Sequence, residues 1–174
     1  MSEEMSGFGT TEPTDQQKAL VDEALFLRGR IIASYAQVEF LLADLVVKLD
    51  LRFPYVIDAR IKAVKKIAER PGYEIYKDEL DHTCDAFDQF DELRHFITHG
   101  FLSLTMDTKG NHQFEFLRYV REGEGKFNMM SAKTTVERLN QAADDIGEYV
   151  SLVIRLFERI YREKKLEPKA PEGA

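Results

Sequence analysis

The chain has 174 residues, of which 44% are hydrophobic and 32% charged, and its formal net charge is −7. This length suits one domain with a sizeable hydrophobic core. A single cysteine excludes an internal disulfide framework and a cysteine-based zinc site, and the acidic balance argues against a broad, non-specific nucleic-acid surface. No apolar run approaches the roughly 20 residues that span a bilayer, and the acidic start lacks signal-peptide features. We therefore expect a cytoplasmic protein that makes no membrane contact.

Apolar periodicity divides the chain into a helical domain at residues 15–166, with flexible tails expected at residues 1–14 and 167–174. Thr14 and Gln17 match a capping box at the start of the first helix. Four helices are predicted, at residues 15–51, 56–70, 74–99 and, from a cap at 131 or 134, to about 165. The first helix carries additional apolar residues, including Phe26 and Phe40, beyond what one neighbour can cover. It is expected to contact several partners or a second subunit.

The period changes after Gly100, where residues 101–106 and 114–120 are typical of a β-hairpin. Residues 126–130 are a candidate for a short third strand. The predicted fold is therefore all-α: an up-and-down four-helix bundle with a β-hairpin inserted between helices 3 and 4. Aromatic residues of the hairpin could stack on nucleic-acid bases, although alternating aromatics more often cover a core; these are Phe101, Phe116 and Tyr119.

One short stretch indicates chemistry, Glu92-Leu93-Arg94-His95-Phe96-Ile97-Thr98-His99-Gly100. A continuous third helix would place Arg94 within about 40° of Leu80 and Phe87, inside an apolar stripe. A guanidinium is costly to bury unpaired, so we expect a counter-charge. Glu39, on the flank of the first helix, is the candidate; the alternative is a solvated glutamate at the edge of the apolar face.

Histidine and arginine together suit metal-free cleavage of a phosphodiester. A histidine with its pKa near 6.5 can act as a general acid or base, and an arginine fork binds two phosphate oxygens. The alternative is that Arg94 is a structural ion-pair residue and His99 is a C-terminal histidine favoured by the helix dipole. His95 and His99 are also one turn apart, but no third ligand at a metal-binding spacing accompanies them. No metal and no cofactor is therefore expected.

Arg94-His95, three further residues and His99-Gly100 resemble the R-x4–6-H motif of the HEPN superfamily, a group of small α-helical domains. The polar residue that usually follows the arginine in that family is matched by His95. The segment 34–39, which ends at Glu39, resembles the acidic segment of the family's first long helix. The resemblance covers about ten residues as a motif and residues 15–165 as an architecture.

The resemblance implies a metal-independent endoribonuclease, a toxin or defence effector, that cleaves RNA by 2′-OH attack and leaves a 2′,3′-cyclic phosphate. Arg94 and His99 would be catalytic, with His95 and Glu39 in supporting roles. A homodimer with the site at its interface is implied as well, with RNA as the ligand and an antitoxin or a nucleotidyltransferase as a partner. The second function that the resemblance allows is a non-catalytic HEPN-like dimeric module that binds a partner protein or nucleotide.

Overall fold

The computed structural model describes residues 12–166, apart from the side chains of residues 91 and 92. Five α-helices and a three-stranded antiparallel sheet make up this part of the chain. The helices are α1 (Asp15–Lys48), α2 (Ile57–Ile67), α3 (Lys77–Gln89), α4 (Asp91–His99) and α5 (Val136–Lys164), with a 3₁₀ turn η1 (Glu74–Tyr76) before α3. The strands are β1 (Phe101–Met106), β2 (His112–Gly123) and β3 (Lys126–Thr134). Apart from residues 12–14, the predicted tails lie outside the described residues.

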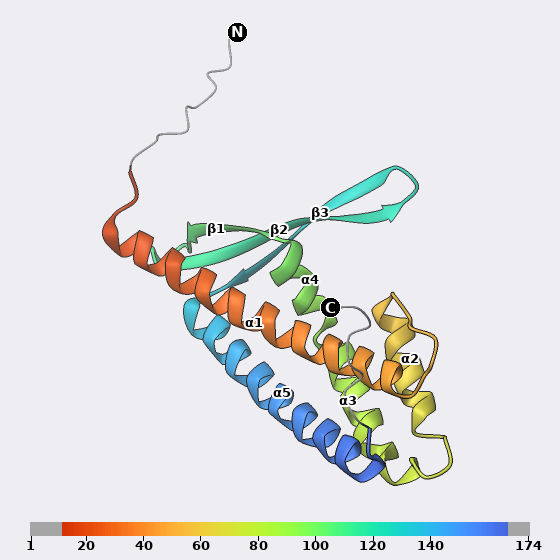
Figure 1. Ribbon diagram of the computed structural model, residues 1–174. Coiled ribbons are helices and arrows are strands. Elements are labelled where there is room, and N and C mark those ends of the chain that lie inside the picture. The colour runs from red at the N-terminus through yellow and green to blue at the C-terminus, as the bar shows by residue number, and fades with distance from the viewer. Residues whose placement is uncertain (1–11, 167–174) are drawn as a thin grey trace, which may run out of the picture.

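Helix α1 forms as its sequence predicts. The Thr14 hydroxyl accepts a hydrogen bond from the Gln17 backbone N–H at 3.2 Å, and the Gln17 side chain accepts one from the Thr14 N–H at 2.9 Å. The predicted capping box is thus confirmed. Its buried stripe faces α5, α2 and α4 (Figure 1); the members are Ala24, Leu27, Ile31, Tyr35, Val38, Leu42, Leu45 and Val46.

The helices do not alternate in direction as an up-and-down bundle requires. Arg30, early in α1, pairs with Asp144, early in α5, at 3.1 Å. Late in the same two helices, the Tyr161 hydroxyl donates to Asp44 at 2.7 Å, so α1 and α5 run the same way (Figure 1). The reason is that the sheet between α4 and α5 returns the chain to the end where α1 begins. The structure agrees with the predicted all-α class in being mostly helical, but it also contains a three-stranded sheet, and the four-helix bundle with a hairpin is not confirmed.

The predicted continuous helix over residues 74–99 is wrong, because the chain leaves helical geometry at Phe90. There φ is −88° and ψ is −5°, and the Phe90 N–H bonds to the Phe87 carbonyl three residues back, at 3.2 Å. The Phe90 carbonyl accepts a hydrogen bond from the hydroxyl of Tyr35 on α1, at 2.7 Å. The Phe90 ring packs between Tyr35 and Tyr149. Contacts from two other helices thus start a new helix, α4, on which the candidate site lies.

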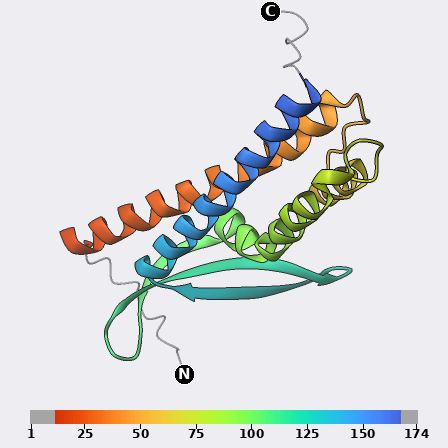
Figure 2. The same ribbon diagram turned by 90° about the horizontal axis from the view of Figure 1, so that it is seen from below.

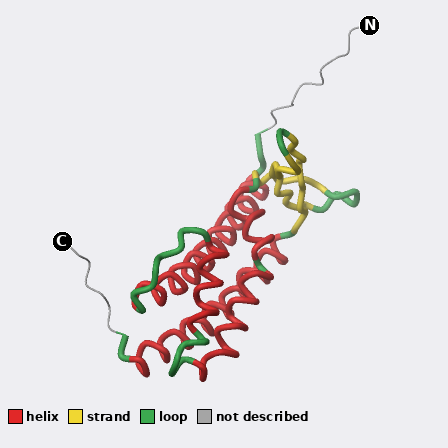
Figure 3. The backbone as a smooth tube through the Cα atoms, turned by 90° about the vertical axis from the view of Figure 1, so that its right-hand side faces the viewer, coloured by secondary structure: helices red, strands yellow, loops and turns green. Residues whose placement is uncertain are grey.

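The sheet lies at one end of the helices (Figure 3) and has the order β1-β2-β3. Its inner face adds the buried Phe114 and Phe116 to the core, because successive strand residues point to opposite faces. The third strand that was expected at residues 126–130 is present but longer, because β3 continues to Thr134. It pairs with β2 beyond the end of β1, and that part of the hairpin stands away from the helices (Figure 2).

Among the helices of residues 12–166, none combines the length and the apolar character that a membrane crossing needs.

Candidate functional site

Helix α4 carries the candidate residues and lies between α1 and β2. It ends at Gly100, where an added Cβ would lie 2.4 Å from the Phe96 carbonyl oxygen and 3.3 Å from Phe116. Only glycine fits so close to the backbone. The last carbonyls of the helix are satisfied by Arg28 of α1, whose Nη2 donates to Thr98 at 3.2 Å and to Gly100 at 3.1 Å. The position of His99 is thus held by backbone contacts on both sides.

Arg94 pairs with Glu39, the contact expected from the sequence. Its Nη1 lies 3.4 Å from Oε1 of Glu39, and the two side chains are 16% and 29% exposed. Arg60 of α2 lies 3.8 Å from the other carboxylate oxygen and also donates to the backbone carbonyls of Pro54 and Tyr55. One carboxylate therefore sits between two arginines from two helices. The counter-charge explains how Arg94 is tolerated away from bulk water.

His95 connects Arg94 to His99. Nη2 of Arg94 lies 3.4 Å from Nε2 of His95, and the two histidine rings are 5.9 Å apart with an angle of 32° between their planes. His99 itself is exposed. The structure thus arranges Glu39, Arg94, His95 and His99 in a row from α1 to the end of α4.

His99 lines a shallow depression of about 380 Å³ against the sheet, and Arg94 is not among the residues that form it. The lining residues are His99, Phe101, Leu117, Arg118, Tyr119 and Met129. Arg94 and His99, the two residues predicted to be catalytic, therefore do not line this depression together. Arg118 is the arginine that lines this depression together with His99.

Arg118 was not singled out from the sequence. Its guanidinium stacks on the ring of Phe96 with 5.0 Å between the guanidinium carbon and the ring centre. Its Nε is buried and has no hydrogen-bond partner among the residues that the structure describes. An unpartnered buried donor is unusual in a folded protein. The alternation of residues along β2 does not mark Arg118 as a site residue. Arg118 reaches the depression and the ring of Phe96 only because β2 packs on α4.

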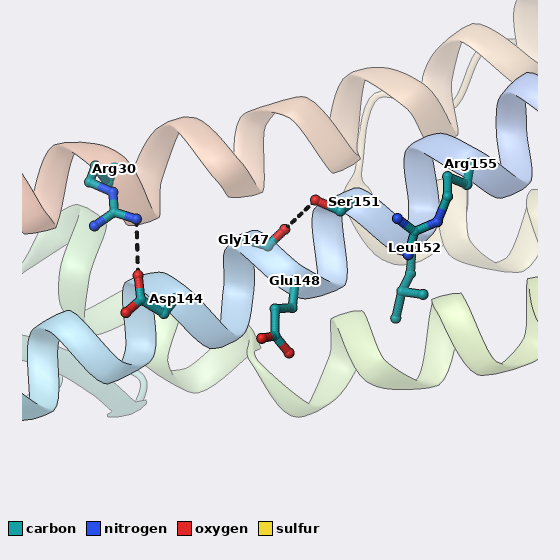
Figure 4. Close-up of a pocket in the computed structure, with 7 residues that line it drawn as sticks. All are labelled: Arg30, Asp144, Gly147, Glu148, Ser151, Leu152 and Arg155. Carbon is teal, nitrogen blue, oxygen red and sulfur yellow. Dashed lines mark hydrogen bonds and ion pairs between the residues drawn. The ribbon is translucent and has the colours of Figure 1, made fainter.

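The side chains described between residues 12 and 166 include no group of three His, Cys, Asp or Glu residues that could hold a metal ion. A second depression, of about 610 Å³, lies along α1 and α5 (Figure 4). It contains the Arg30–Asp144 ion pair together with Glu148 and Arg155, and none of the predicted site residues.

Comparisons with protein-family models, with curated proteins and with solved structures find no match to this chain.

Proposed function

We propose that this protein is a HEPN-like, metal-independent endoribonuclease, a toxin or defence effector acting on RNA in the cytoplasm. The observation that carries the proposal is the row from Glu39 through Arg94 and His95 to the exposed His99. Cleavage of a phosphodiester by the 2′-OH needs an acid–base residue and a cation near the phosphate. The exposed His99 supplies the first, and Arg94, on the far side of His95, supplies the second.

The reaction is an internal transfer of the phosphoryl group. A neutral His99 takes the proton of a ribose 2′-OH, the 2′-oxygen forms a bond to the adjacent phosphorus, and the bond from phosphorus to the 5′-oxygen breaks. A protonated histidine gives its proton to that leaving oxygen. The products are a 2′,3′-cyclic phosphate and a 5′-hydroxyl, without consumption of water. Arg94 holds the phosphoryl oxygens, and His95 and Glu39 orient the pair.

One chain supplies His99 once, so the acid and the base come from two copies in a homodimer. The outer face of α1 carries exposed apolar residues that suit a homodimer, although this face is turned away from the buried stripe that contacts α4. Phe26 and Phe40 on that face are each 66% exposed, and Gly29, Ala33 and Ala36 between them are exposed as well. An added Cβ at Gly29 meets nothing within 4 Å, so no contact with the described part of the chain requires this glycine.

The same face is self-complementary under a two-fold axis. Phe26 and Phe40 each lie seven residues from Ala33. Two antiparallel α1 helices crossing at Ala33 would place Phe26 of each copy beside Phe40 of the other, with Gly29, Ala33 and Ala36 at the crossing and Arg30 and Gln37 at its edge. This contact would bury two otherwise exposed aromatic rings in each chain.

Sedimentation tests the assembly at micromolar concentration, where the parent chain is expected to form a dimer. Gly29→Leu should give the 20.1 kDa monomer without loss of helix, because leucine suits a helix better than glycine and blocks only the close crossing. Gly147→Leu on α5 is the matched control, since a Cβ there also meets nothing within 4 Å. A monomeric parent chain would end the two-copy mechanism.

The decisive assay for the activity incubates the purified protein with mixed RNAs, with and without EDTA. We expect EDTA-resistant cleavage that leaves 2′,3′-cyclic phosphates. His99→Ala and Arg94→Ala should each lower the rate on the order of 10²-fold or more. Unchanged cleavage by the His99→Ala variant would refute the mechanism.

The second candidate is a non-catalytic dimeric module that binds a partner protein or a nucleotide. The engagement of Arg94 with Glu39 favours it, because a guanidinium already paired at 3.4 Å has less freedom to bind phosphate. An antitoxin or a nucleotidyltransferase is the partner that we propose in either case. Folded protein that cleaves none of the RNAs would favour this candidate.

A further inference from the structure

The β2–β3 hairpin continues as a two-stranded ribbon beyond the edge of the core. Strand β1 pairs only with residues 112–117 of β2, whereas β3 pairs with β2 as far as Gly123. Beyond residue 117 no third strand from the described residues 12–166 pairs with the ribbon, and its tip stands clear of the helices (Figures 1 and 2). Two-stranded ribbons are marginal in water, so the aromatic residues exposed on this one call for an explanation.

The outer face of the ribbon carries large exposed side chains. Tyr119 is 74% exposed and lies opposite Met129, which is 60% exposed; Phe127, at 62%, lies opposite Arg121. Phe101 of β1, paired with Leu117, extends the same face at 69% exposure. The inner face, by contrast, holds the buried Phe114 and Phe116. Large exposed apolar patches of this kind usually mark binding sites.

This surface is continuous with the depression that His99 lines. Phe101, Tyr119 and Met129 belong to both. The depression, at about 380 Å³, is within the size range of small-ligand pockets. Whatever lies on the ribbon therefore reaches the exposed His99 at the end of α4.

The outward residues of the ribbon include one arginine. By strand alternation, the outward residues of β2 from Leu117 to Arg121 and of β3 from Phe127 to Ser131 include Arg121 and no carboxylate. Glu122 and Glu124 lie at the exposed tip, where the register shifts between Arg121 and Gly123, and Glu115 lies opposite Lys133. A local surface of aromatic rings with a cation suits a single-stranded nucleic acid, whose bases stack on rings while its phosphates meet arginine. An apolar protein partner would have no need of the cation.

We propose that the outer face of the β2–β3 ribbon is a stacking platform for unpaired RNA. Bases lie on Tyr119 and Phe127, and the strand passes through the depression at His99 beside Arg118. This inference deepens the proposed function and rests on it: it names single-stranded RNA, rather than duplex, as the substrate class. A duplex keeps its bases stacked inside and cannot use exposed rings in this way.

Binding is measured separately from cleavage with a short unpaired RNA whose sugars are all 2′-O-methylated, so that no 2′-OH can attack. Fluorescence anisotropy of the labelled strand with the full-length protein should show binding. Tyr119→Ala and Phe127→Ala should each weaken it between about 5- and 100-fold, the usual worth of one stacked base. Tyr119→Phe should retain the affinity, because it keeps the ring. Tyr55→Ala, which removes an exposed aromatic ring in the loop between α1 and α2, outside the proposed dimer face, is the matched control and should change nothing.

A second readout reports stacking directly. The chain has no tryptophan, so Tyr119→Trp introduces a single reporter whose fluorescence should be quenched by the unpaired strand and not by a duplex of the same length.

Each outcome decides one of the two proposals. If the platform variants bind as the parent chain does, or if duplex and single strand bind equally, the platform is wrong even where His99→Ala abolishes cleavage. If the unpaired strand binds through Tyr119 and Phe127 but no RNA is cleaved, the platform stands and the ribonuclease proposal falls. Absence of any binding to the RNA strand overturns the platform and favours a protein as the occupant of this face.

Discussion

The contact between Glu39 and Arg94 can be measured as a coupling free energy. Two unit charges 3.4 Å apart attract by about 5 kcal/mol at an effective dielectric constant of about 20, and desolvation offsets most of that. Exposed pairs retain about 0.2–1 kcal/mol, while breaking a buried pair costs about 3–5 kcal/mol. With side chains 16% and 29% exposed, this pair lies between the two cases. We expect a coupling of about 1–2 kcal/mol.

A double-mutant cycle isolates that coupling, using Glu39→Gln, Arg94→Gln and the double variant. The cycle is needed because Arg94 also contacts His95 and Glu39 also pairs with Arg60, so each single change removes more than one interaction. Urea unfolding followed by circular dichroism gives each free energy. All samples are kept at one protein concentration, since association would shift the midpoint.

The matched control is the ion pair between Glu79 of α3 and Arg159 of α5, whose side chains are 49% and 36% exposed. Its cycle should yield about 0.2–1 kcal/mol, in the range of surface pairs. A coupling at Glu39–Arg94 no larger than this control would refute the reasoning, because the half-buried position of the pair would then contribute nothing.

Three further predictions concern the Tyr35 hydroxyl at the helix break, the loss of stability at alkaline pH and the Cys84 thiol. Tyr35→Phe removes the hydrogen bond to the Phe90 carbonyl and should lower the unfolding free energy by about 1 kcal/mol. The control Tyr149→Phe removes a hydrogen bond of the same length to the Thr83 carbonyl and should lower it by as much. Only Tyr35→Phe should also slow RNA cleavage, because Phe90 starts α4. Burial and the hydrogen bond to Glu163 raise the pKa of Tyr76 from 10.0 to about 12. The unfolded chain therefore loses this proton at lower pH than the folded chain, and the free energy of unfolding should fall as the pH rises from about 10 to 12. Unfolding midpoints measured across that window should fall less steeply in the Tyr76→Phe variant. Burial raises the pKa of the Cys84 thiol to about 12. Near neutral pH, a thiol reagent should therefore react on the order of 10²-fold more slowly with the folded chain than with the urea-unfolded chain. Similar rates would show that α3 opens readily.

Much of the local structure could be predicted from the sequence, because it depends on residues close together in the chain. The Thr14–Gln17 capping box needs residues only three positions apart. The apolar period of α1 and α5 and the change to strands after Gly100 are likewise local patterns, and the structure agrees with them. The structure also shows the expected pairing of Glu39 with Arg94, but the stripe from which it was argued required a continuous helix through Phe90, where the helix breaks.

The remaining features were decided by tertiary contacts. The break at Phe90 has no glycine or proline to announce it; it lies where Tyr35 and Tyr149, far away in sequence, contact Phe90. The common direction of α1 and α5 follows from the path of the chain through the sheet. Arg118 and the depression at His99 exist only where β2 packs on α4. A local pattern states which face of a segment is apolar, but which other segment covers that face depends on contacts between residues distant in the chain.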